Sequence, residues 1–559
     1  MLSTPECGHD QQLVGEACPP CASHPATVCG RTSPPRHSFT RTGENRSSVA
    51  SNRLRFAFAM VGVAIYLLPF MRVLLARTDE GTFLVGATRI LHGQVFARDF
   101  VEVMGPGTFY WLALFYKTLG ANFLATRACL FLSWMTTAIL VYLLSRRVSP
   151  SSRLLPLTLI IVTGFSSLGI GISHHIDSNC LALLSVLCLL VWHQKRSPRW
   201  LVFAGAVAAL TALVHQPKGL LLFLAAGAWI WSLERKHGRA ARALCSVVAG
   251  FAGIVGIAIA YFAAHGALAD VIRATLVWPF QHYSTINQVP YAYGTFMFNW
   301  RGVPLGTPGS YCIFLLASLL MAPFLYIAAL PGVVALQIFL GRLRPLAPHV
   351  SLYLLSGLAL WLSELHRKDI VHLVFGSPLL IILSIQLLSH SRRMLSRLAL
   401  VVLTASSCTL AVCNLLAVLT AHSVSTRVGN VAMLEGGEEF AALNARIAPG
   451  EQIFAYPYCP SYYFLTQTYN PTRFSILQSG YNTPDETREV IRVLESHKVN
   501  HVLWDTDFRK RSLALVFPAA LKLPDDLAPL EAYLHERYLL VYSRNGFQIL
   551  ERRHEPNGD

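Results

Sequence analysis

The sequence predicts a polytopic α-helical membrane protein with about eleven transmembrane helices, followed by a small C-terminal α/β domain. Apolar residues make up 53% of the 559 residues and charged residues only 14%, against about 25% charged in an average soluble domain. The mean hydropathy is +0.45, and long apolar runs recur over the first 420 residues. A soluble fold of this length has no core large enough to bury so much apolar surface.

The charge balance and the cysteine pattern exclude other classes of protein. Lys and Arg number 46 against 30 Asp and Glu, a net charge of +16. We interpret the excess of Lys and Arg as a signal for the orientation of the chain in the membrane. We expect no nucleic-acid partner. The 12 Cys are spread over the whole chain, which is not the pattern of a disulfide scaffold.

The first 53 residues differ in composition from the rest of the chain. Residues 1–53 contain Pro, Ser, Thr, His and Gly with almost no aliphatic run, which predicts a disordered tail. No apolar segment of the signal-peptide type follows the start. The end of the tail is rich in Arg, and a basic flank before the first span places it in the cytoplasm.

Residues 54–422 are predicted to form the membrane domain. About 20 residues cross a bilayer, and bundled helices can be shorter or tilted. The run at 311–341 contains Pro323 and Pro331, and we interpret it as one kinked span. The predicted spans lie at 55–76, 123–145, 154–172, 178–193, 200–215, 218–233, 243–264, 311–341, 348–364, 370–389 and 396–420.

The loops between these runs alternate in charge. The even-numbered loops are rich in Lys and Arg, whereas the odd-numbered loops, including the long loops 77–122 and 265–310, are poorer. Because basic loops stay in the cytoplasm, we expect the N-terminus inside and the C-terminus outside.

Residues 425–559 have an ordinary charge content and short alternating apolar stretches, which predict an extracytoplasmic α/β domain. The expected strands are 452–456, 501–504 and 539–542, and the expected helices are 484–497 and 530–537.

Ionisable residues at a membrane edge are costly, so each one is a functional candidate. Asp79 and Glu80 stand directly after the first predicted span. A partly desolvated carboxylate there can accept a hydroxyl proton as a general base. The alternative is a solvated helix end. The stretch 82–93 after the two acids is amphipathic, which is typical of a helix in the membrane interface.

The first outer loop resembles that of a known class of enzymes. Asp79-Glu80-Gly81, then Gly93, Arg98-Asp99-Phe100 and Gly105-Pro106-Gly107 are similar to the loop of the GT-C membrane glycosyltransferases, most closely glycosyltransferase family 39. The resemblance covers roughly residues 55–420. It implies an acidic catalytic base, Asp79 with Glu80 beside it, and a polyprenyl-phosphate sugar as donor. We also expect a lipid, glycan or protein acceptor, inversion at the sugar, the bacterial inner membrane as location, and substrate binding by Asp99 and Glu102.

Three further clusters lie on the same predicted side. The family often has an Asp at the start of the fourth span, which Asp177 matches, although His174 and His175 replace the Arg that commonly precedes it. Lys218, in His215-Gln216-Pro217-Lys218-Gly219, resembles the Lys-containing turn of the family. The last cluster fits an Arg-x-Asp-x-x-His pattern of related sequences. It comprises His366, Arg367, Asp369 and His372.

These clusters suggest substrate binding and no metal. Arg presents a planar donor fork suited to phosphate oxygens, and a Lys at headgroup level can contact the same anion. Asp369 could orient Arg367, and His372 lies one helical turn further along. Adjacent side chains on a helix point about 100° apart, so His174 and His175 are poor joint ligands. We expect no metal and no cofactor.

The sequence leaves two other classes of protein open. A transporter or flippase would carry ionisable residues deep in several spans, but here they lie at one edge. A surface-polysaccharide polymerase or ligase would act at the same face, with less dependence on the acid of the first loop.

Overall fold

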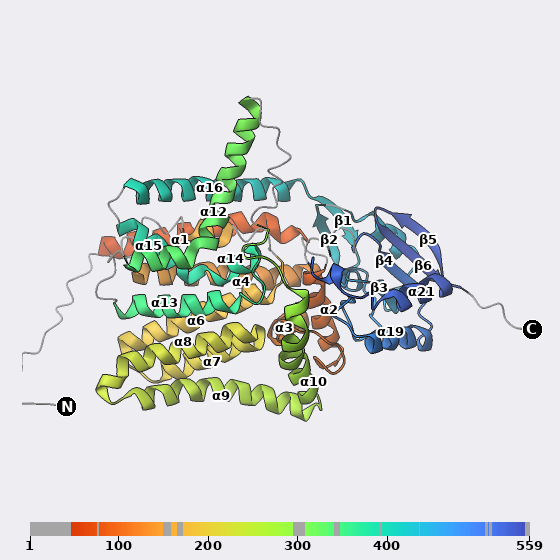
Figure 1. Ribbon diagram of the computed structural model, residues 1–559, viewed down its shortest axis with the longest axis horizontal. Coiled ribbons are helices and arrows are strands. Elements are labelled where there is room, and N and C mark those ends of the chain that lie inside the picture. The colour runs from red at the N-terminus through yellow and green to blue at the C-terminus, as the bar shows by residue number, and fades with distance from the viewer. Residues whose placement is uncertain are drawn as a thin grey trace, which may run out of the picture. The chain divides into compact units, whose positions relative to one another are not determined.

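The computed structural model describes residues 46–74, 78–148, 158–164, 171–294, 308–339, 347–390, 394–434, 436–508, 513 and 517–553 (Figure 1). The described residues from Arg55 onward belong to one compact unit. Most of the predicted tail, including all its Cys, and most of the predicted span 154–172 lie outside the described residues. Helix α1 begins at Arg46, within the stretch expected to be tail.

Apolar helices form at the other predicted spans. Among the described residues, six helices are long and apolar enough to cross a membrane, or seven if α14 and α15, bent by 74° at their break, form one span. The run with two prolines is one helix, as predicted, and the total of eleven spans stays a prediction. The helices are α1 (Arg46–Leu67), α4 (Phe123–Val148), α6 (His174–Lys195), α7 (Arg199–Val214), α8 (Gln216–Glu234), α9 (Ala240–Ala264), α12 (Pro308–Phe339), α13 (Pro348–Ser363), α14 (Ile370–Gly376), α15 (Pro378–His390) and α16 (Met394–Leu419).

The first outer loop folds into two helices, α2 (Asp79–Leu91) and α3 (Gly107–Leu119). The predicted amphipathic helix is α2, and most of its residues are buried against the rest of the protein. Gly81 allows this packing, since a Cβ at that position would lie 2.3 Å from the backbone nitrogen of Ser461 in the C-terminal domain.

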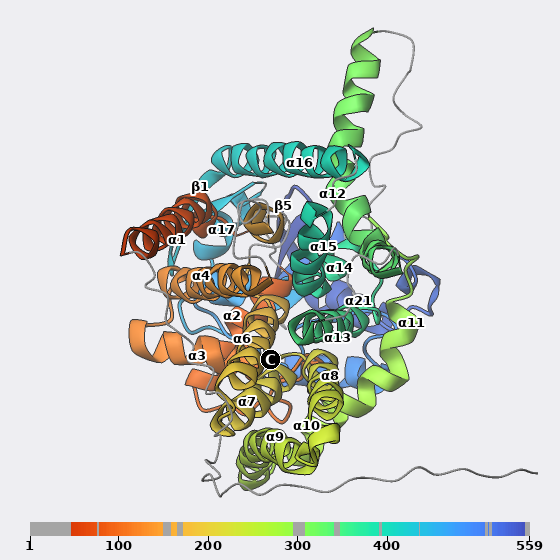
Figure 2. The same ribbon diagram turned by 90° about the vertical axis from the view of Figure 1, so that its left-hand side faces the viewer.

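Short helical turns follow α9 and lead back toward the bundle. They are α10 (Leu268–Ile272), η5 (Arg273–Val277), η6 (Pro279–Tyr283) and α11 (Ser284–Ile286). Viewed along the helices, α8 and α13 lie side by side (Figure 2). Their neighbouring ends carry the polar residues of the candidate site.

The C-terminal domain contains the predicted strands and helices. Its four-stranded sheet has the order β3-β4-β6-β5, with β3 (Ile453–Tyr456) parallel to β4 (His501–Asp505) and the other pairs antiparallel. Val490 and Leu494 pack one face of this sheet together with Leu530 and Leu534. The other elements are the β1 (His422–Thr426) and β2 (Gly429–Met433) hairpin, α17 (Glu438–Asn444), α18 (Ser461–Leu465), α19 (Pro484–Ser496), η9 (Ala520–Lys522), α21 (Ala528–Arg537), β5 (Tyr538–Arg544) and β6 (Phe547–Arg552).

Backbone contacts join this domain to the first outer loop. The Val101 N–H donates to the Arg473 carbonyl oxygen at 2.8 Å, and Val101 forms an isolated bridge with Phe474. The Arg89 guanidinium donates to the Thr472 carbonyl oxygen at 2.8 Å. The domain therefore covers α2, which begins with the two predicted catalytic acids.

Candidate functional site

Three of the predicted clusters come together because helices begin or end there. Helix α6 begins at His174, with the Ser173 hydroxyl accepting from the His175 N–H. Helix α8 begins after His215, whose Nδ1 accepts from the Lys218 N–H at 3.3 Å. Helix α13 ends at Ser363, and α14 begins after Asp369. We name the side chains gathered there the polar cluster: His174, His175, His215, Lys218, Glu364, His366, Arg367, Asp369 and His372.

The centre of the polar cluster is a buried ion pair. Lys218 Nζ lies 2.7 Å from Glu364 Oε1, and both side chains have 0% exposure. Lys218 also donates to Asn179 Oδ1 at 2.8 Å. The predicted cation is therefore held by a carboxylate and an amide and is not open to the membrane surface.

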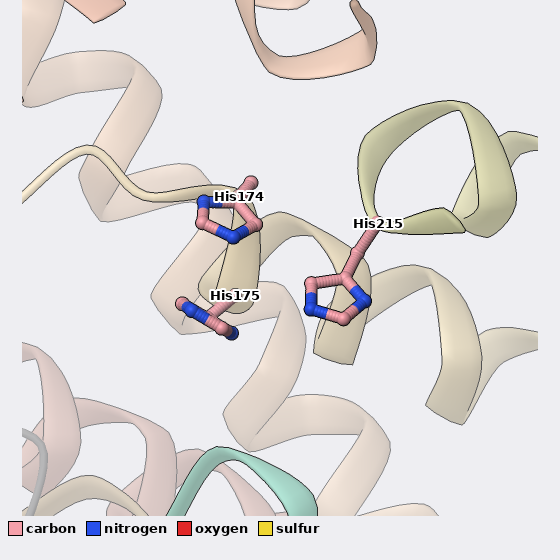
Figure 3. Close-up of side chains that lie close together, drawn as sticks. All are labelled: His174, His175 and His215. Atoms are coloured by element: carbon pink, nitrogen blue, oxygen red, sulfur yellow. The ribbon is translucent and has the colours of Figure 1, made fainter. Parts of the chain in front are cut away.

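Imidazole rings surround this pair. Figure 3 shows the rings of His174 and His175 adjacent, with His215 across from them. The ring centroids of His174 and His175 are 4.0 Å apart, and those of His174 and His215 are 5.3 Å apart. His366 continues the group, at 5.6 Å from both His215 and His372.

The same rings offer a possible metal-ligand set, which the local hydrogen bonding disfavours. One ligand atom each from His174, His175 and His215 lies within 4.8 Å of the others, and Glu364 and His366 form a second such group with His215. His215 Nδ1 accepts the Lys218 N–H, which leaves this ring one nitrogen fewer to offer a metal. The absence of a metal stays a prediction.

Arg367, Asp369 and His372 form a hydrogen-bonded triad at the start of α14. Arg367 Nε donates to Asp369 Oδ2 at 2.5 Å, and His372 Nδ1 lies 2.7 Å from Asp369 Oδ1. Burial raises the pKa of Asp369, but His372 and Arg367 outweigh it and hold that pKa well below its usual range. The carboxylate is thus charged and orients both bases, in the arrangement expected from the spacing.

The segment after α9 borders the polar cluster. Asn287 accepts from Arg367 at 2.7 Å, and the rings of Tyr283 and His366 are 5.3 Å apart. Burial raises the pKa of Tyr283, and Arg367 lowers it while Asp369, Glu364 and Asp79 raise it further. Tyr283 therefore lies within electrostatic reach of both Arg367 and the first-loop acid Asp79.

The two adjacent acids of the first loop have different surroundings. Asp79 is exposed, and its Oδ1 accepts from the Tyr458 hydroxyl at 2.8 Å. Glu80 is 1% exposed, and its carboxylate accepts from Arg127 at 2.6 and 3.1 Å and from the Ile172 N–H at 3.0 Å. Asp79 can meet a substrate, whereas Glu80 fixes α2 against α4.

Helix α2 also touches the polar cluster directly. The rings of Phe83 and His174 are 5.8 Å apart. Phe83 lies one turn after Asp79 on α2, so the start of this helix is near the start of α6.

Asp99 and Glu102, the other predicted acids of this loop, lie elsewhere. Asp99 accepts from Arg98 and from the Val95 N–H at 2.7 Å, and Arg98 lowers its pKa. Glu102 is 2% exposed. Burial raises its pKa to about 8, although hydrogen bonding with Ser475 and the charge of Arg89 oppose the shift. Neither acid is in the polar cluster.

Asp177 is bonded within the helical bundle. Its carboxylate accepts from the Thr108 hydroxyl at 2.9 Å and the Ser133 hydroxyl at 2.8 Å. It lines a largely apolar cavity of about 760 Å³ with residues of α3, α4, α7 and α9. Asp177 therefore joins three helices and is separate from the triad at α14.

Several partners were not selected as site residues from the sequence. Tyr458 and Arg127 lie far along the chain from the acids that they bind, and no spacing rule connects them. His215 stands inside a quoted motif, Glu364 lies two residues before His366, and a buried Lys requires a counter-charge. That requirement was the available signal for Glu364.

Comparisons with known proteins agree with this fold. Residues 104–260 match a family model described as dolichyl-phosphate-mannose-protein mannosyltransferase. A search of the curated proteins found no match. The crystal structure of ArnT from Cupriavidus metallidurans bound to undecaprenyl phosphate has a TM-score of 0.53 at 12% identity, covering 89% of this chain and 97% of that chain.

The apo crystal structure of the same ArnT also has a TM-score of 0.53 at 12% identity, covering 90% of this chain and 98% of that chain. The resemblance inferred from the first outer loop is confirmed at the level of the fold. The chain is a membrane protein with the fold of the GT-C glycosyltransferases, and its residues 104–260 match the dolichyl-phosphate-mannose-protein mannosyltransferase family.

Proposed function

We propose that this chain is an inverting glycosyltransferase that moves a sugar from a polyprenyl-phosphate donor to an acceptor hydroxyl at the outer face of the bacterial inner membrane. The observation that carries the proposal is an exposed carboxylate, Asp79, close to the polar cluster that contains Arg367. Tyr283 lies within electrostatic reach of both Asp79 and Arg367, and Phe83 of α2 touches His174.

The comparisons support a polyprenyl-phosphate donor. The matching family model is described by a dolichyl-phosphate-linked mannose, and one structural neighbour was solved with undecaprenyl phosphate. Both molecules are polyprenyl phosphates, so the proposed donor has the same lipid and phosphate chemistry. The sugar and the acceptor are not part of the proposal.

In the proposed reaction, Asp79 is the general base. The acceptor hydroxyl gives its proton to the Asp79 carboxylate while its oxygen attacks the anomeric carbon. The bond between that carbon and the phosphate oxygen breaks, and polyprenyl phosphate leaves with the electron pair. Attack from the side opposite the phosphate inverts the anomeric centre.

Arg367 is the proposed contact for the leaving phosphate. Asp369 orients its guanidinium, and a preorganised cation stabilises the charge that grows on the phosphate. Lys218 is buried behind Glu364, so we assign it to holding α6, α8 and α13 together around the phosphate. Glu80 positions α2 through Arg127.

The remaining predicted residues have supporting roles in the proposal. His174, His175, His366 and His372 form the wall of the donor site, and Asp177, Asp99 and Glu102 support the helices and loop around it.

The test is sugar transfer by purified protein in proteoliposomes, with radiolabelled polyprenyl-phosphate sugars as donors and membrane extracts as acceptors. Asp79→Asn is expected to lower kcat by about 10²–10⁴-fold, the usual contribution of a general base. The matched control is Asp485→Asn, an exposed acid on α19, which is expected to keep wild-type activity. Wild-type transfer by Asp79→Asn would reject Asp79 as the base.

A further inference from the structure

Tyr458, a side chain of the C-terminal domain, lies against the proposed base. Its hydroxyl donates to Asp79 Oδ1 at 2.8 Å, although 379 residues separate the two in the chain. Tyr458 is 7% exposed, whereas Asp79 is exposed. The phenol thus approaches the carboxylate from the protein side and leaves its solvent side open.

The phenol is held in place by its own domain. Tyr458 comes shortly after β3, and the residue before it, Pro457, accepts from the Leu477 N–H at 2.9 Å. The Tyr458 ring packs edge-on against Phe508, with centroids 6.0 Å apart. These contacts fix the hydroxyl before any substrate arrives.

Burial keeps the phenol in its donating form. Burial and the charge of Asp79 raise the pKa of Tyr458 well above its ordinary value. Tyr458 therefore remains protonated over the working pH range, and a neutral O–H next to a carboxylate makes a charge-assisted hydrogen bond.

The domain also fixes the helix that carries Asp79. Gly81 packs so closely on Ser461 that a Cβ would lie 2.3 Å from its nitrogen. Arg89, near the other end of α2, donates to the Thr472 carbonyl oxygen at 2.8 Å. Both ends of α2 are thus held to the domain that supplies Tyr458.

We propose that Tyr458 is a positioning residue that orients Asp79, so that Oδ1 is held by the phenol and Oδ2 is presented to the acceptor hydroxyl. The C-terminal domain then completes the transfer site as well as covering it. This inference rests on the proposed function, because it gives Tyr458 a role only if Asp79 is the base.

Among the described residues, the charge of Asp79 also raises the pKa of three other titratable groups. They are Glu102 from the first loop, Tyr283 from the segment after α9 and Tyr481 from the C-terminal domain. All three side chains are retained in the Tyr458 variants, so the acidic limb is compared with wild type against the same surrounding groups.

The test compares the pH dependence of kcat for wild type, Tyr458→Phe and Tyr538→Phe. Tyr538 also loses a buried phenol hydrogen bond, to the Val499 carbonyl oxygen at 2.9 Å, but lies in β5 away from Asp79. Tyr458→Phe is expected to lower kcat about tenfold, with little change in the donor KM, and to move the acidic limb of the profile to higher pH. Tyr538→Phe is expected to move neither quantity.

A second variant keeps the shape of the side chain in case Tyr458→Phe does not fold. Replacing Tyr458 by a more acidic fluorotyrosine strengthens the donated hydrogen bond and is expected to move the acidic limb to lower pH. An unchanged kcat and profile in both Tyr458 variants, with Asp79→Asn inactive, overturns the inference and leaves the proposed function intact. An active Asp79→Asn overturns the proposed function, and the inference with it.

Discussion

At the scale of single residues, burial separates side chains that the sequence presents alike. Asp79 and Glu80 are adjacent acids, yet Asp79 is exposed and Glu80 is paired with Arg127 inside the protein. From the sequence, both acids are candidate bases. Their surroundings leave only Asp79 as a candidate. The two side chains point to different sides of α2, because successive side chains on a helix point about 100° apart.

Glu102 leads to a prediction on pH and stability. Its pKa of about 8 in the folded protein is above that of an unfolded Glu, about 4.3. Between these pH values the folded state binds more protons, so its stability falls as the pH rises. Glu102→Gln is neutral at every pH and is expected to melt at a higher temperature than wild type at pH 8, with the difference shrinking toward pH 5.

The measurement for Glu102 is the melting temperature of detergent-solubilised protein at pH 5, 6.5 and 8. Asp485→Asn, on the exposed face of α19, serves as the control and is expected to follow wild type. A constant difference between Glu102→Gln and wild type across the three pH values would show that Glu102 does not take up a proton on folding.

The Lys218–Glu364 pair leads to a second prediction at this scale. Both side chains have 0% exposure, and breaking one partner of a buried pair typically costs about 3–5 kcal/mol because the other charge is left unpaired. Lys218→Met is expected to destabilise the protein by about this amount. The double variant Lys218→Met with Glu364→Gln should recover much of the loss.

The stability of both variants is measured by denaturation in detergent, with Arg473→Met as the control. Arg473 pairs with Glu489 at the surface, where the two side chains are 37% and 32% exposed, and such pairs contribute about 1 kcal/mol or less. A loss for Lys218→Met no larger than that for Arg473→Met would contradict the account of the buried pair.

At the scale of elements, the ends of helices build the site. His215 and Asp369 each cap the helix that comes after them. Residues between two helices therefore contribute to the candidate site. The close packing of α2 against the C-terminal domain also depends on a small residue, Gly81, near the start of the helix.

Gly81→Ala is therefore expected to be destabilising. Its Cβ would lie 2.3 Å from the Ser461 nitrogen, and overpacking of this kind costs about 1–3 kcal/mol. The matched control is Gly62→Ala on α1, where a Cβ meets nothing within 4 Å and better helix propensity is expected to be neutral or favourable in thermal unfolding. Equal melting temperatures for the two variants would argue against the packing described.

The sequence predicts elements well where one physical rule dominates. Apolar length places the helices, and alternation with turn residues places β3, β4 and β5. The strand β6 and the hairpin β1–β2 are not among the predicted strands. The strand β1 is exposed and polar, and such strands give no strong pattern. Of the candidate site, local spacing predicts the Arg367–Asp369–His372 triad. Long-range partners such as Tyr458 depend on the tertiary fold and have no local signature.

At the scale of the whole molecule, Figure 1 shows the C-terminal domain at one end of the helical bundle. Asp79 bonds to Tyr458 of that domain, and the Lys218–Glu364 pair lies at the start of α8 and the end of α13. The proposed topology puts this end outside the membrane. The cationic loops Lys195–Arg199 and Arg235–Arg242 belong to the opposite ends of α6 to α9, as the positive-inside rule requires for that orientation.

Cysteine labelling in intact cells tests this orientation. His92→Cys, at the end of α2, is expected to react with a membrane-impermeant maleimide added outside, whereas Lys236→Cys, at the end of α8, is expected to react only after the membrane is opened. The unsubstituted chain gives the background from its native Cys. Labelling of Lys236→Cys, but not of His92→Cys, from the outside would show that the orientation is the opposite of the one proposed.

The most direct test of the central claim is a structure of the protein with a bound polyprenyl-phosphate sugar in a lipid nanodisc. The account predicts the phosphate in contact with the Arg367 guanidinium and the anomeric carbon facing the acceptor space beside Asp79 Oδ2. A phosphate bound away from the polar cluster, or a sugar on the far side of α2 from Asp79, would contradict it.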